Sequence, residues 1–325
     1  MKLVLYYEIK KLLYSWKRCA LLGIVILSPF VQVLVVEWMD QRNVIYNENS
    51  SISVQQQKVE MDTLRKDIAG SVTPSYIEKR KQELNALQEE SVDVNDIHYQ
   101  TIHHAYYDTF NYYNFRQGIL YSKDAPDVVK QDILNHTPQY GPYEGWLDRM
   151  EIYKNSALCY LVVCVLLFGN LFNQEHAVGI MDLLKSSKLG KRQLAWAKIL
   201  STWIITIIMG LLMYGVLEVS SQIFLDLSGS DTTILMFENA FQIYNFSQIN
   251  MQAFLLTMIA GLGCSSLSLF TSTLFHKPLH SLMIAGCIFI IPQYYSMEIQ
   301  GFSLTQLFPS VFVQFQGRIQ IMSSP

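Results

Sequence analysis

Five long apolar stretches constrain this 325-residue chain more than any other feature of its sequence. They cover residues 18–37, 153–172, 199–219, 253–275 and 279–295. A helix needs roughly 20 residues to cross about 30 Å of hydrocarbon. Half of all residues are apolar, and the charged residues are concentrated outside these stretches. The sequence therefore predicts an all-α fold, a polytopic bundle of membrane-spanning helices.

The first stretch also has two features of a secretory signal peptide, a basic start and an apolar core from Cys19 to Val36. A cleaved signal ends in a pattern of small residues at the cleavage site. Here the core ends in Val35-Val36-Glu37-Trp38, which lacks that pattern. We therefore expect an uncleaved first span.

Lysine and arginine are distributed unevenly around the predicted spans, and this distribution predicts their orientation. Basic residues cluster before the first span and between the second and third: Lys2, Lys10, Lys11, Lys17 and Arg18, then Lys185, Lys188, Lys191, Arg192 and Lys198. The predicted outer loop at 220–252 has acidic residues but no lysine or arginine. Because cytoplasmic flanks retain basic residues, we expect a multi-pass plasma-membrane protein with a cytoplasmic N-terminus.

The polar regions complete the predicted organisation. Residues 1–17 are expected to form an interfacial helix, although an ordinary basic flank fits them equally well. Residues 38–152 are expected to form a helical extracytoplasmic domain in the first outer loop. Thr73-Pro74 and Asp124-Ala125-Pro126 resemble helix starts. Helices are predicted near 53–69, 74–91, 97–121 and 126–135, and from about 143 into the second span.

The cysteines and the C-terminal tail add two expectations. All five cysteines lie within or beside predicted spans, so no disulfide is expected: Cys19, Cys159, Cys164, Cys264 and Cys287. The tail at 296–325 is not apolar enough to cross a membrane. Five spans place the C-terminus outside, and a sixth span is either missing or lies beyond the chain end.

Aromatic residues and histidines are concentrated in the helix predicted at 97–121. The aromatic residues form either a substrate-contact or interfacial surface or the core of a helical hairpin: Tyr99, Tyr106, Tyr107, Phe110, Tyr112, Tyr113 and Phe115. His98, His103, His104 and Asp108 invite a metal hypothesis, since His104 and Asp108 share a helix face. No second ligand cluster accompanies them, so surface histidines and no metal site are expected.

The fourth span contains small residues at close spacing, among them Gly261, Ser265 and Ser268. Small residues allow two helix backbones to approach closely. These three residues are therefore candidates for helix packing within the bundle or for a dimer interface.

The connection at 173–198 has the most informative pattern in the chain. Asn173 can cap a short helix, and Glu175 suits the positive end of its dipole. Ile180, Leu183 and Leu184 form an apolar stripe too short to span a membrane. A short amphipathic helix exposed to the cytosol needs a partner that covers its stripe.

This connection resembles the cytoplasmic signature of the ABC-2 type transporter permeases. The matching residues are Glu175, Gly179, Leu183, Arg192 and Lys198, with Ser186 or Ser187 at the serine position. Asp182 and Leu184 of the same segment are further candidates for ATPase coupling. The resemblance implies a coupling helix that docks on a separate ABC ATPase subunit, which would bind ATP. It also implies a second permease subunit, identical or homologous. Two departures are the absent proline, replaced by Ser187-Lys188-Leu189, and the missing sixth span.

Several catalytic patterns are absent from the sequence. It contains no Gly-x-x-x-x-Gly-Lys-Ser/Thr loop for nucleotide phosphates, and no Gly-x-Ser-x-Gly or His-Glu-x-x-His motif. We therefore expect a transport subunit that has no enzymatic activity of its own, binds no cofactor directly and has no nucleic-acid partner. The expected function is export of a peptide, lipid or drug-like substrate. The alternative is a membrane-anchored sensor or binding protein whose outer domain receives a ligand.

Overall fold

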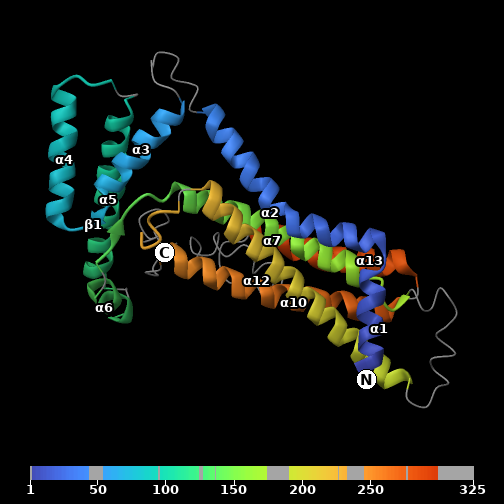
Figure 1. Cartoon of the computed structure of the whole chain (residues 1–325). Coiled ribbons are helices and arrows are strands. Elements are labelled where there is room, and N and C mark those ends of the chain that lie inside the picture. Colours follow the sequence, from blue (N-terminus) through green and yellow to red (C-terminus); the bar gives the residue numbers. More distant parts are fainter. Residues whose placement is uncertain are drawn as a thin grey trace. The chain divides into compact units, whose positions relative to one another are not determined.

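The computed structural model describes residues 2–43, 54–93, 96–123, 127–135, 137–173, 190–225, 227–232, 245–275 and 277–298. Most of these residues are helical (Figure 1). The helices are α1 (Lys2–Leu13), α2 (Trp16–Asn43), α3 (Val54–Ile68), α4 (Pro74–Glu89), α5 (Ile97–Tyr121), α6 (Asp127–Asn135), α7 (Glu144–Phe168), α10 (Gly190–Phe224), α12 (Phe246–Leu274) and α13 (Pro278–Glu298). Two short strands, β1 (Gly70–Ser71) and β2 (Gln139–Tyr140), form an antiparallel pair.

The chain divides into two compact units. The bundle unit comprises the described residues of Met1–Gln32, Glu151–Ser220 and Gln252–Phe315. The hairpin unit comprises those of Val33–Met150 and Ser221–Met251. The two units are described separately below.

Among the described residues, four helices are long and apolar enough to cross a membrane: Trp16–Trp38, Gly145–Phe168, Arg192–Phe224 and Phe246–Leu274. They correspond to the first four predicted spans, and the all-α prediction is confirmed for the described residues. The predicted fifth span lies in α13, where the apolar stretch of described residues, Leu279–Phe289, is shorter than a crossing requires. The fifth span therefore stays a prediction.

The surface of the bundle unit is rich in large apolar side chains. Among the exposed ones are Ile24, Leu27, Ile208, Leu211, Leu255 and Phe270, from α2, α10 and α12. A water-soluble protein rarely exposes contiguous apolar surface of this kind. Lipid chains would cover it without the cost of hydrating apolar groups, so the composition and the surface both indicate a membrane protein.

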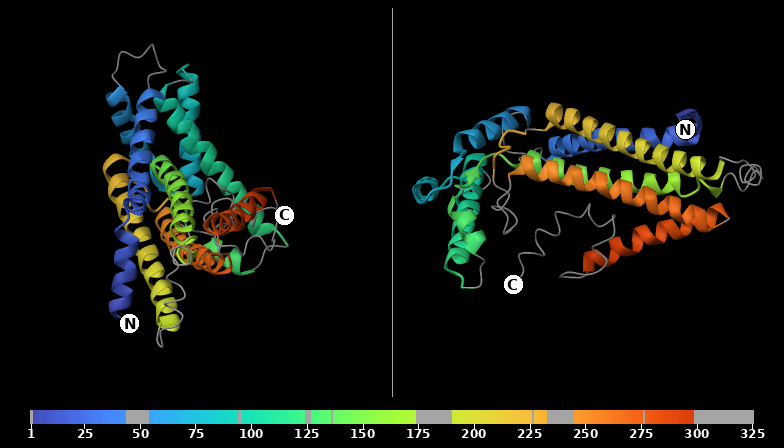
Figure 2. Two further views of the ribbon diagram at one scale, coloured as in Figure 1. Left: turned by 90° about the vertical axis from the view of Figure 1, so that its right-hand side faces the viewer. Right: turned by 90° about the horizontal axis from the view of Figure 1, so that it is seen from below.

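In the bundle unit, α7, α10 and α12 run side by side (Figure 2). Tyrosines of α7 join these helices through hydrogen bonds. The Tyr153 hydroxyl lies 2.9 Å from the Ala253 carbonyl oxygen and 2.5 Å from the Thr257 hydroxyl, both on α12. About two turns further along α7, the Tyr160 hydroxyl donates to the Thr206 carbonyl of α10 at 3.1 Å. These phenols are almost fully buried. Their polar tips are satisfied by neighbouring helices, which a buried tyrosine requires.

The hairpin unit is built around α5, which packs against α3, α4 and α6. Apolar residues such as Ile77, Leu84 and Ile102 form its core. The N-terminus of α5 is capped by the Asp96 carboxylate, which accepts hydrogen bonds from the His98 and Tyr99 amides. The β1–β2 pair then joins the end of α3 to the segment before α7, with Gly70 opposite Tyr140.

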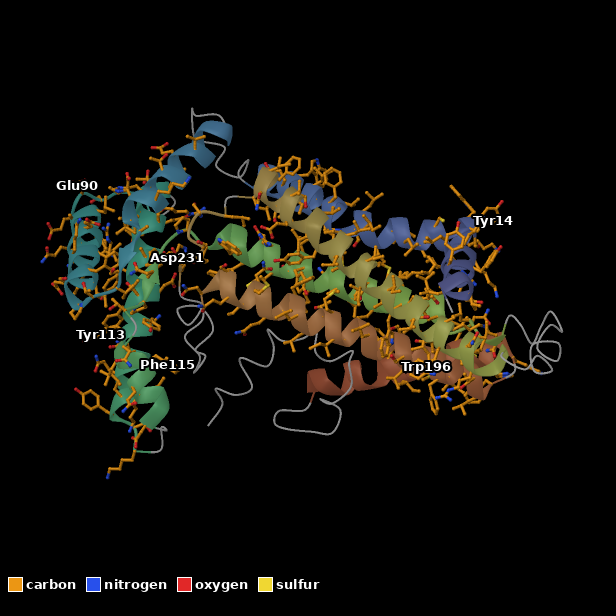
Figure 3. The ribbon with its side chains drawn as sticks, turned by 60° about the horizontal axis from the view of Figure 1, so that its bottom comes forward. Tyr14, Glu90, Tyr113, Phe115, Trp196 and Asp231 are labelled. Carbon is orange, nitrogen blue, oxygen red and sulfur yellow. The ribbon has the colours of Figure 1, made fainter. Side chains whose placement is uncertain are left out.

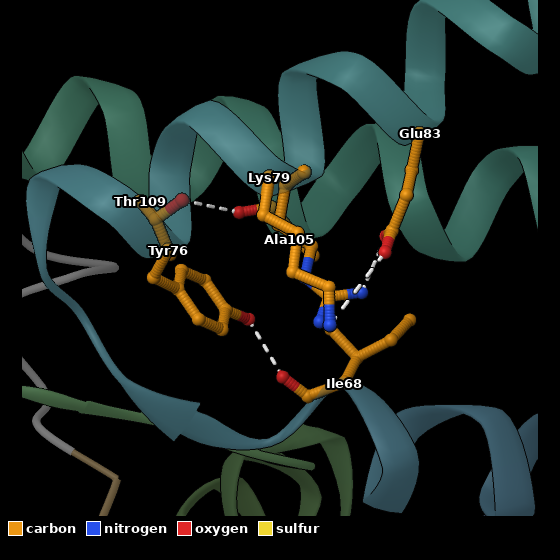
Figure 4. Close-up of polar contacts among 7 residues, drawn as sticks. Ile68, Tyr76, Lys79, Glu83, Ala105 and Thr109 are labelled. Carbon is orange, nitrogen blue, oxygen red and sulfur yellow. Dashed lines mark hydrogen bonds and ion pairs between the residues drawn. The ribbon is translucent and has the colours of Figure 1, made fainter.

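Polar contacts hold α4 in place at its start (Figure 4). Thr73 caps α4 by accepting from the Tyr76 amide at 3.2 Å, and Pro74 occupies the first turn. The Tyr76 hydroxyl donates to the Ile68 carbonyl at 2.7 Å. Arg80, which is buried, pairs with Glu83 at 2.5 Å. These contacts secure the turn from α3 to α4.

The helix predictions for this region agree closely with the structure. The helix predicted at 97–121 coincides with α5, and those near 53–69, 74–91 and 126–135 correspond to α3, α4 and α6. The helix predicted from 143 is α7, which begins at Glu144. The short β1–β2 pair was not predicted, because two residues cannot show a strand alternation.

The aromatic residues of α5 divide between the core and the surface of the hairpin unit. Tyr112 is 4% exposed and belongs to the core, whereas Tyr107 is 45% exposed. Along the more exposed side, Tyr106 stacks on Phe110 with ring centroids 5.5 Å apart. The hairpin-core alternative therefore holds for Tyr112, whereas a substrate-contact or interfacial surface stays a prediction.

A tight turn closes the hairpin unit beside α7. Gly229 has a φ of +90°, a conformation that favours glycine, and a Cβ there would collide with the Pro142 carbonyl. The Trp146 indole donates to the Leu227 carbonyl at 3.0 Å and stacks on Phe246. The turn at 227–232 is thereby joined to the start of α7.

Candidate functional site

The predicted coupling residues fall, in the sequence, between the end of α7 and the first turns of α10, two helix ends that lie at the same end of the bundle unit (Figure 1). Five of them, Glu175, Gly179, Asp182, Leu183 and Leu184, fall in the segment 174–189, outside the described residues. Arg192 and Lys198 lie on the first turns of α10. Arg192 is exposed, whereas Lys198 is fully buried.

Lys198 contacts the chain just beyond the end of α7. Its ammonium donates a hydrogen bond to the Leu171 carbonyl at 3.3 Å. The same nitrogen lies 4.5 Å from the centre of the Phe172 ring, within the range of a cation–π interaction. A buried cation needs polar or aromatic partners to compensate for its lost hydration, and the carbonyl and the ring are two such partners. A buried cation at this position is therefore favourable on two counts.

A second contact at the end of α7 comes from α13. The Ser281 hydroxyl, which is fully buried, donates to the Gly169 carbonyl at 2.6 Å. A Cβ at Gly169 would lie 3.0 Å from Leu282 and 2.8 Å from the Val165 carbonyl oxygen. The glycine thus permits the close approach of α13. Side chains of α10 and α13 together satisfy two carbonyls at this helix end.

Asn173 is the last described residue before the segment 174–189. Its side chain is fully buried, and neither amide atom has a hydrogen-bond partner among the described residues. Asparagine is a favourable N-cap, as expected from the sequence for this position. The capping interaction itself stays a prediction, because the helix it would cap lies outside the described residues.

Exposed aromatic side chains surround the same end of the bundle unit (Figure 3). Tyr14 precedes α2, and Trp196 lies on the first turns of α10. Both side chains are well exposed. Trp16 is also exposed at the start of α2. Tyrosine and tryptophan are enriched where hydrocarbon meets the headgroup layer. With the exposed lysines Lys10 and Lys17, they have the composition of a membrane–water boundary.

Near its middle, the bundle unit contains the small residues of α12 that were predicted to pack or dimerise. Gly261 faces Tyr160, so that a Cβ there would lie 2.6 Å from two atoms of the phenol ring. Ser265 and Ser268 are buried, and their hydroxyls bond back to carbonyls of α12 itself. The space beside Gly261 is filled by the side chain of Tyr160 from α7.

The hairpin unit brings together some of the titratable residues singled out on α5. The Tyr143 hydroxyl donates to Asp108 at 3.3 Å. Burial raises the pKa of the Asp108 carboxyl, and His104, the Tyr143 hydrogen bond and His103 oppose that shift. Among the described residues, no three His, Cys, Asp or Glu side chains are arranged to hold a metal ion. The structure thus offers no geometric support for the metal hypothesis in that part of the chain.

Sequence reasoning missed the contacts just beyond the end of α7 and those of Tyr160. Leu171, Gly169 and Ser281 have no distinctive local pattern, because their roles depend on contacts across the fold. Tyr160 looks like an ordinary aromatic residue of an apolar span. The one available signal was the combination of Gly210 and Gly261, which both leave room for the Tyr160 side chain.

Comparisons with protein-family models, curated proteins and solved structures find no match to this chain. The functional interpretation therefore rests on the residues of the chain itself.

Proposed function

We propose that this chain is the membrane-spanning subunit of an ATP-binding-cassette exporter of the ABC-2 type. ATP would be hydrolysed by a separate cytosolic subunit, and a second permease subunit, identical or homologous, would complete the pathway. The N-terminus would lie in the cytoplasm, and the hairpin unit would lie outside the plasma membrane. Transport itself would move peptide, lipid or drug-like cargo outward by alternating access.

The observation that carries this proposal is the contact between Lys198 and Leu171. Lys198 is the last residue of the ABC-2 resemblance, and Leu171 lies just before the segment 174–189. Their hydrogen bond ties the end of α7 to the start of α10. A force applied to the intervening segment would therefore act on both helices together rather than on one loose end. Coupling of this kind needs rigid elements that move between two arrangements.

The basic residues support the proposed orientation. Lysine and arginine of the N-terminal region and of the segment 185–198 flank the first three spans on one side. The exposed Tyr14 and Trp196 lie at the same end of the bundle unit, the end at which α10 begins (Figure 3). Basic residues on cytoplasmic flanks and aromatic residues at the headgroup level are the two expected markers of such a boundary.

The decisive experiment tests the segment on which the motor would dock. Glu175→Ala combined with Leu183→Asp removes a charge from the predicted helix start and places a charge in its apolar stripe. We expect this double variant to reach the membrane but to lose co-purification with an ATPase from native membranes. The matched control, Glu78→Ala with Val59→Asp, makes the same chemical changes at two exposed positions of the hairpin unit. Retention of the ATPase by the coupling variant would contradict the proposal.

A second candidate function is a membrane-anchored binding protein or sensor. The observation that favours it is a cavity in the hairpin unit, between α3, α5 and the segment after β2. A sensor needs such a ligand site, whereas it has no need of an ATPase. Purification from native membranes separates the two functions, because only the exporter should bring an ATP-hydrolysing subunit with it.

A further inference from the structure

The helix α1 has two sides of different chemistry. Glu8 and Leu12 are buried, with 7% and 3% of their surface exposed. Because a helix has 3.6 residues per turn, most of the exposed residues fall within roughly one third of its circumference, on the opposite side: Tyr6, Tyr7, Lys10, Leu13 and Tyr14. Glu8 is the single acidic residue of α1, and it lies on the buried side. The exposed side is therefore aromatic and basic.

This chemistry continues into the first turn of α2. Trp16 is 85% exposed, and Lys17 beside it is exposed as well. Together these side chains form the aromatic–lysine surface: Tyr6, Tyr7, Lys10, Tyr14, Trp16 and Lys17. Tyrosine and tryptophan combine a flat apolar body with a polar tip, and they are enriched where hydrocarbon meets headgroups.

Contacts at the corner between α1 and α2 hold α1 in place. The Arg18 guanidinium donates to the Lys11 carbonyl at 3.2 Å, and the Cys19 thiol donates to the Leu13 carbonyl at 2.8 Å. These carbonyls belong to the last turn of α1 and have no partners within the helix. The corner turns α1 away from the direction of α2 (Figure 1). A helix that runs across the direction of a span can lie along the bilayer boundary.

The partner of this surface is indicated by what lies beside it. Ile24 and Leu27 of α2 are exposed and apolar, so the surface continues from basic and aromatic residues to residues suited to hydrocarbon. A bilayer boundary requires this sequence of chemistries, whereas a soluble acidic protein does not.

Charge then indicates which lipids the surface suits. Lys10 and Lys17 are exposed, and the acidic residue of α1 is buried on the other side. Lysines close to a bilayer attract anionic headgroups, whereas a zwitterionic headgroup has no net charge to attract. The surface therefore complements a lipid with net negative charge.

We propose that the aromatic–lysine surface binds the headgroups of anionic phospholipids, with Lys10 and Lys17 contacting their phosphates and the aromatic rings lying between headgroups and acyl chains. The proposal goes beyond an interfacial position for α1, because it assigns a charge preference to the lipids around this corner. It does not depend on the exporter proposal, since it concerns α1 and the start of α2 alone.

The test measures the lipid selectivity of the full-length protein, reconstituted without any ATPase in phosphatidylcholine vesicles. Spin-labelled phosphatidylglycerol and spin-labelled phosphatidylcholine are compared by electron paramagnetic resonance, which gives the fraction of each lipid that the protein immobilises. At a salt concentration of about 10 mM, we expect phosphatidylglycerol to associate about threefold to fivefold more strongly. In about 1 M salt the preference should fall below about 1.5-fold, because the screening length shrinks from about 30 Å to about 3 Å.

Three variants locate the preference. Lys10→Gln combined with Lys17→Gln should reduce it to about half of the wild-type value or less. Lys10→Arg combined with Lys17→Arg keeps both charges and should keep the preference. The matched control, Lys81→Gln with Lys123→Gln, removes two exposed lysines of the hairpin unit and should also keep it. Circular dichroism and the thermal midpoint of each variant verify that it is folded.

Four results would overturn the proposal. The first is equal association of both lipids with the wild-type protein, and the second is an undiminished preference in the glutamine variant of Lys10 and Lys17. The third is an equal loss of preference in the hairpin control, which would mean that total charge matters rather than this surface. The fourth is unchanged lipid selectivity in the glutamine variant together with lost co-purification of an ATPase from native membranes, because the two lysines would then serve an acidic protein.

Discussion

The Lys198 ammonium donates a hydrogen bond to the carbonyl of Leu171, and both residues are almost completely buried in the bundle unit. A buried cation is costly unless a polar group compensates it. Here the compensation comes from the Leu171 carbonyl, which lies just beyond the end of α7, and from the ring of Phe172. The contact thus satisfies two groups that are expensive to bury alone, and it joins the two helices that border the predicted coupling segment.

Replacing Lys198 with methionine should destabilise the bundle unit. Methionine retains much of the side-chain volume but leaves the Leu171 carbonyl without its donor. A buried polar group that loses its partner costs about 1–3 kcal/mol. The thermal unfolding midpoint in detergent should therefore fall. Lys10→Met, at an exposed position of α1, is the matched control and should change the midpoint little. Equal midpoints for Lys198→Met and wild type would contradict the structural role.

Adding a methyl group at Gly261 should also destabilise the bundle unit. An alanine Cβ would lie 2.6 Å from two atoms of the Tyr160 ring, so the helices must move apart or the ring must shift. Overpacking of this kind costs about 1–3 kcal/mol. Gly215→Ala is the matched control, since a Cβ there meets no other atom within 4 Å. Alanine is a better helix former than glycine, so the control should be neutral or slightly stabilising.

A double-mutant cycle identifies Tyr160 as the partner of Gly261. Tyr160→Leu alone should lower the midpoint, because it removes the hydrogen bond to the Thr206 carbonyl. In that background, Gly261→Ala should cost much less than in the wild-type protein, since the colliding ring is gone. Additive effects of the two substitutions would show that they do not interact.

The sequence predicted helices well where the signals are local. The helix at 97–121 begins after Asp96, whose side chain caps it, and α4 begins at Thr73-Pro74. Caps and prolines act within a few residues, so they can be recognised without knowledge of the fold. Apolar runs of adequate length likewise predicted the four candidate spans.

The contacts of the candidate site could not be predicted from the sequence. A lysine at the edge of a span usually extends its ammonium toward the headgroups. Nothing in the neighbourhood of Lys198 indicates that it turns inward to Leu171, because that carbonyl belongs to a distant part of the chain. The same holds for Tyr160 and Gly261, which only the packing of α7 on α12 brings together. The roles of Glu175, Gly179 and Leu183 stay predictions, since these residues lie outside the described ones.

Asp108 should make the stability of the hairpin unit depend on pH. Burial raises the pKa of its carboxyl above the ordinary value of 3.8, so the folded state binds the proton more tightly than the unfolded chain. This favourable contribution is complete below pH 3.8 and is lost as the pH rises through the folded-state pKa. Asp108→Asn carries no charge at any pH, so it avoids the cost of burying an ionised carboxyl, and it can still accept a hydrogen bond from Tyr143.

The expected result is a thermal midpoint for Asp108→Asn above that of wild type at neutral pH, with the difference shrinking toward zero below pH 3.8. Asp67→Asn, at an exposed position of α3, gives the baseline for removing one surface carboxylate. A neutral-pH midpoint lower than wild type would mean that the charged form of Asp108 stabilises the fold, which is opposite to the effect of its burial.

The proposed topology predicts which residues are accessible from each side of the membrane. Glu90 and Asp231 are exposed positions on the proposed outer side, whereas Lys10 and Lys277 are exposed positions on the proposed cytoplasmic side. Each is replaced by cysteine in a variant whose five native cysteines are alanine, and intact cells are treated with a membrane-impermeant maleimide. Glu90→Cys and Asp231→Cys should react at once, while Lys10→Cys and Lys277→Cys should react only after permeabilisation, with the cysteine-free variant as the background control. The basic flanks dictate this pattern, because moving them across the bilayer is unfavourable. A reversed pattern would place the segment 174–189 on the outer side, where no ATP-driven motor could reach it, and the exporter proposal would fail with the topology.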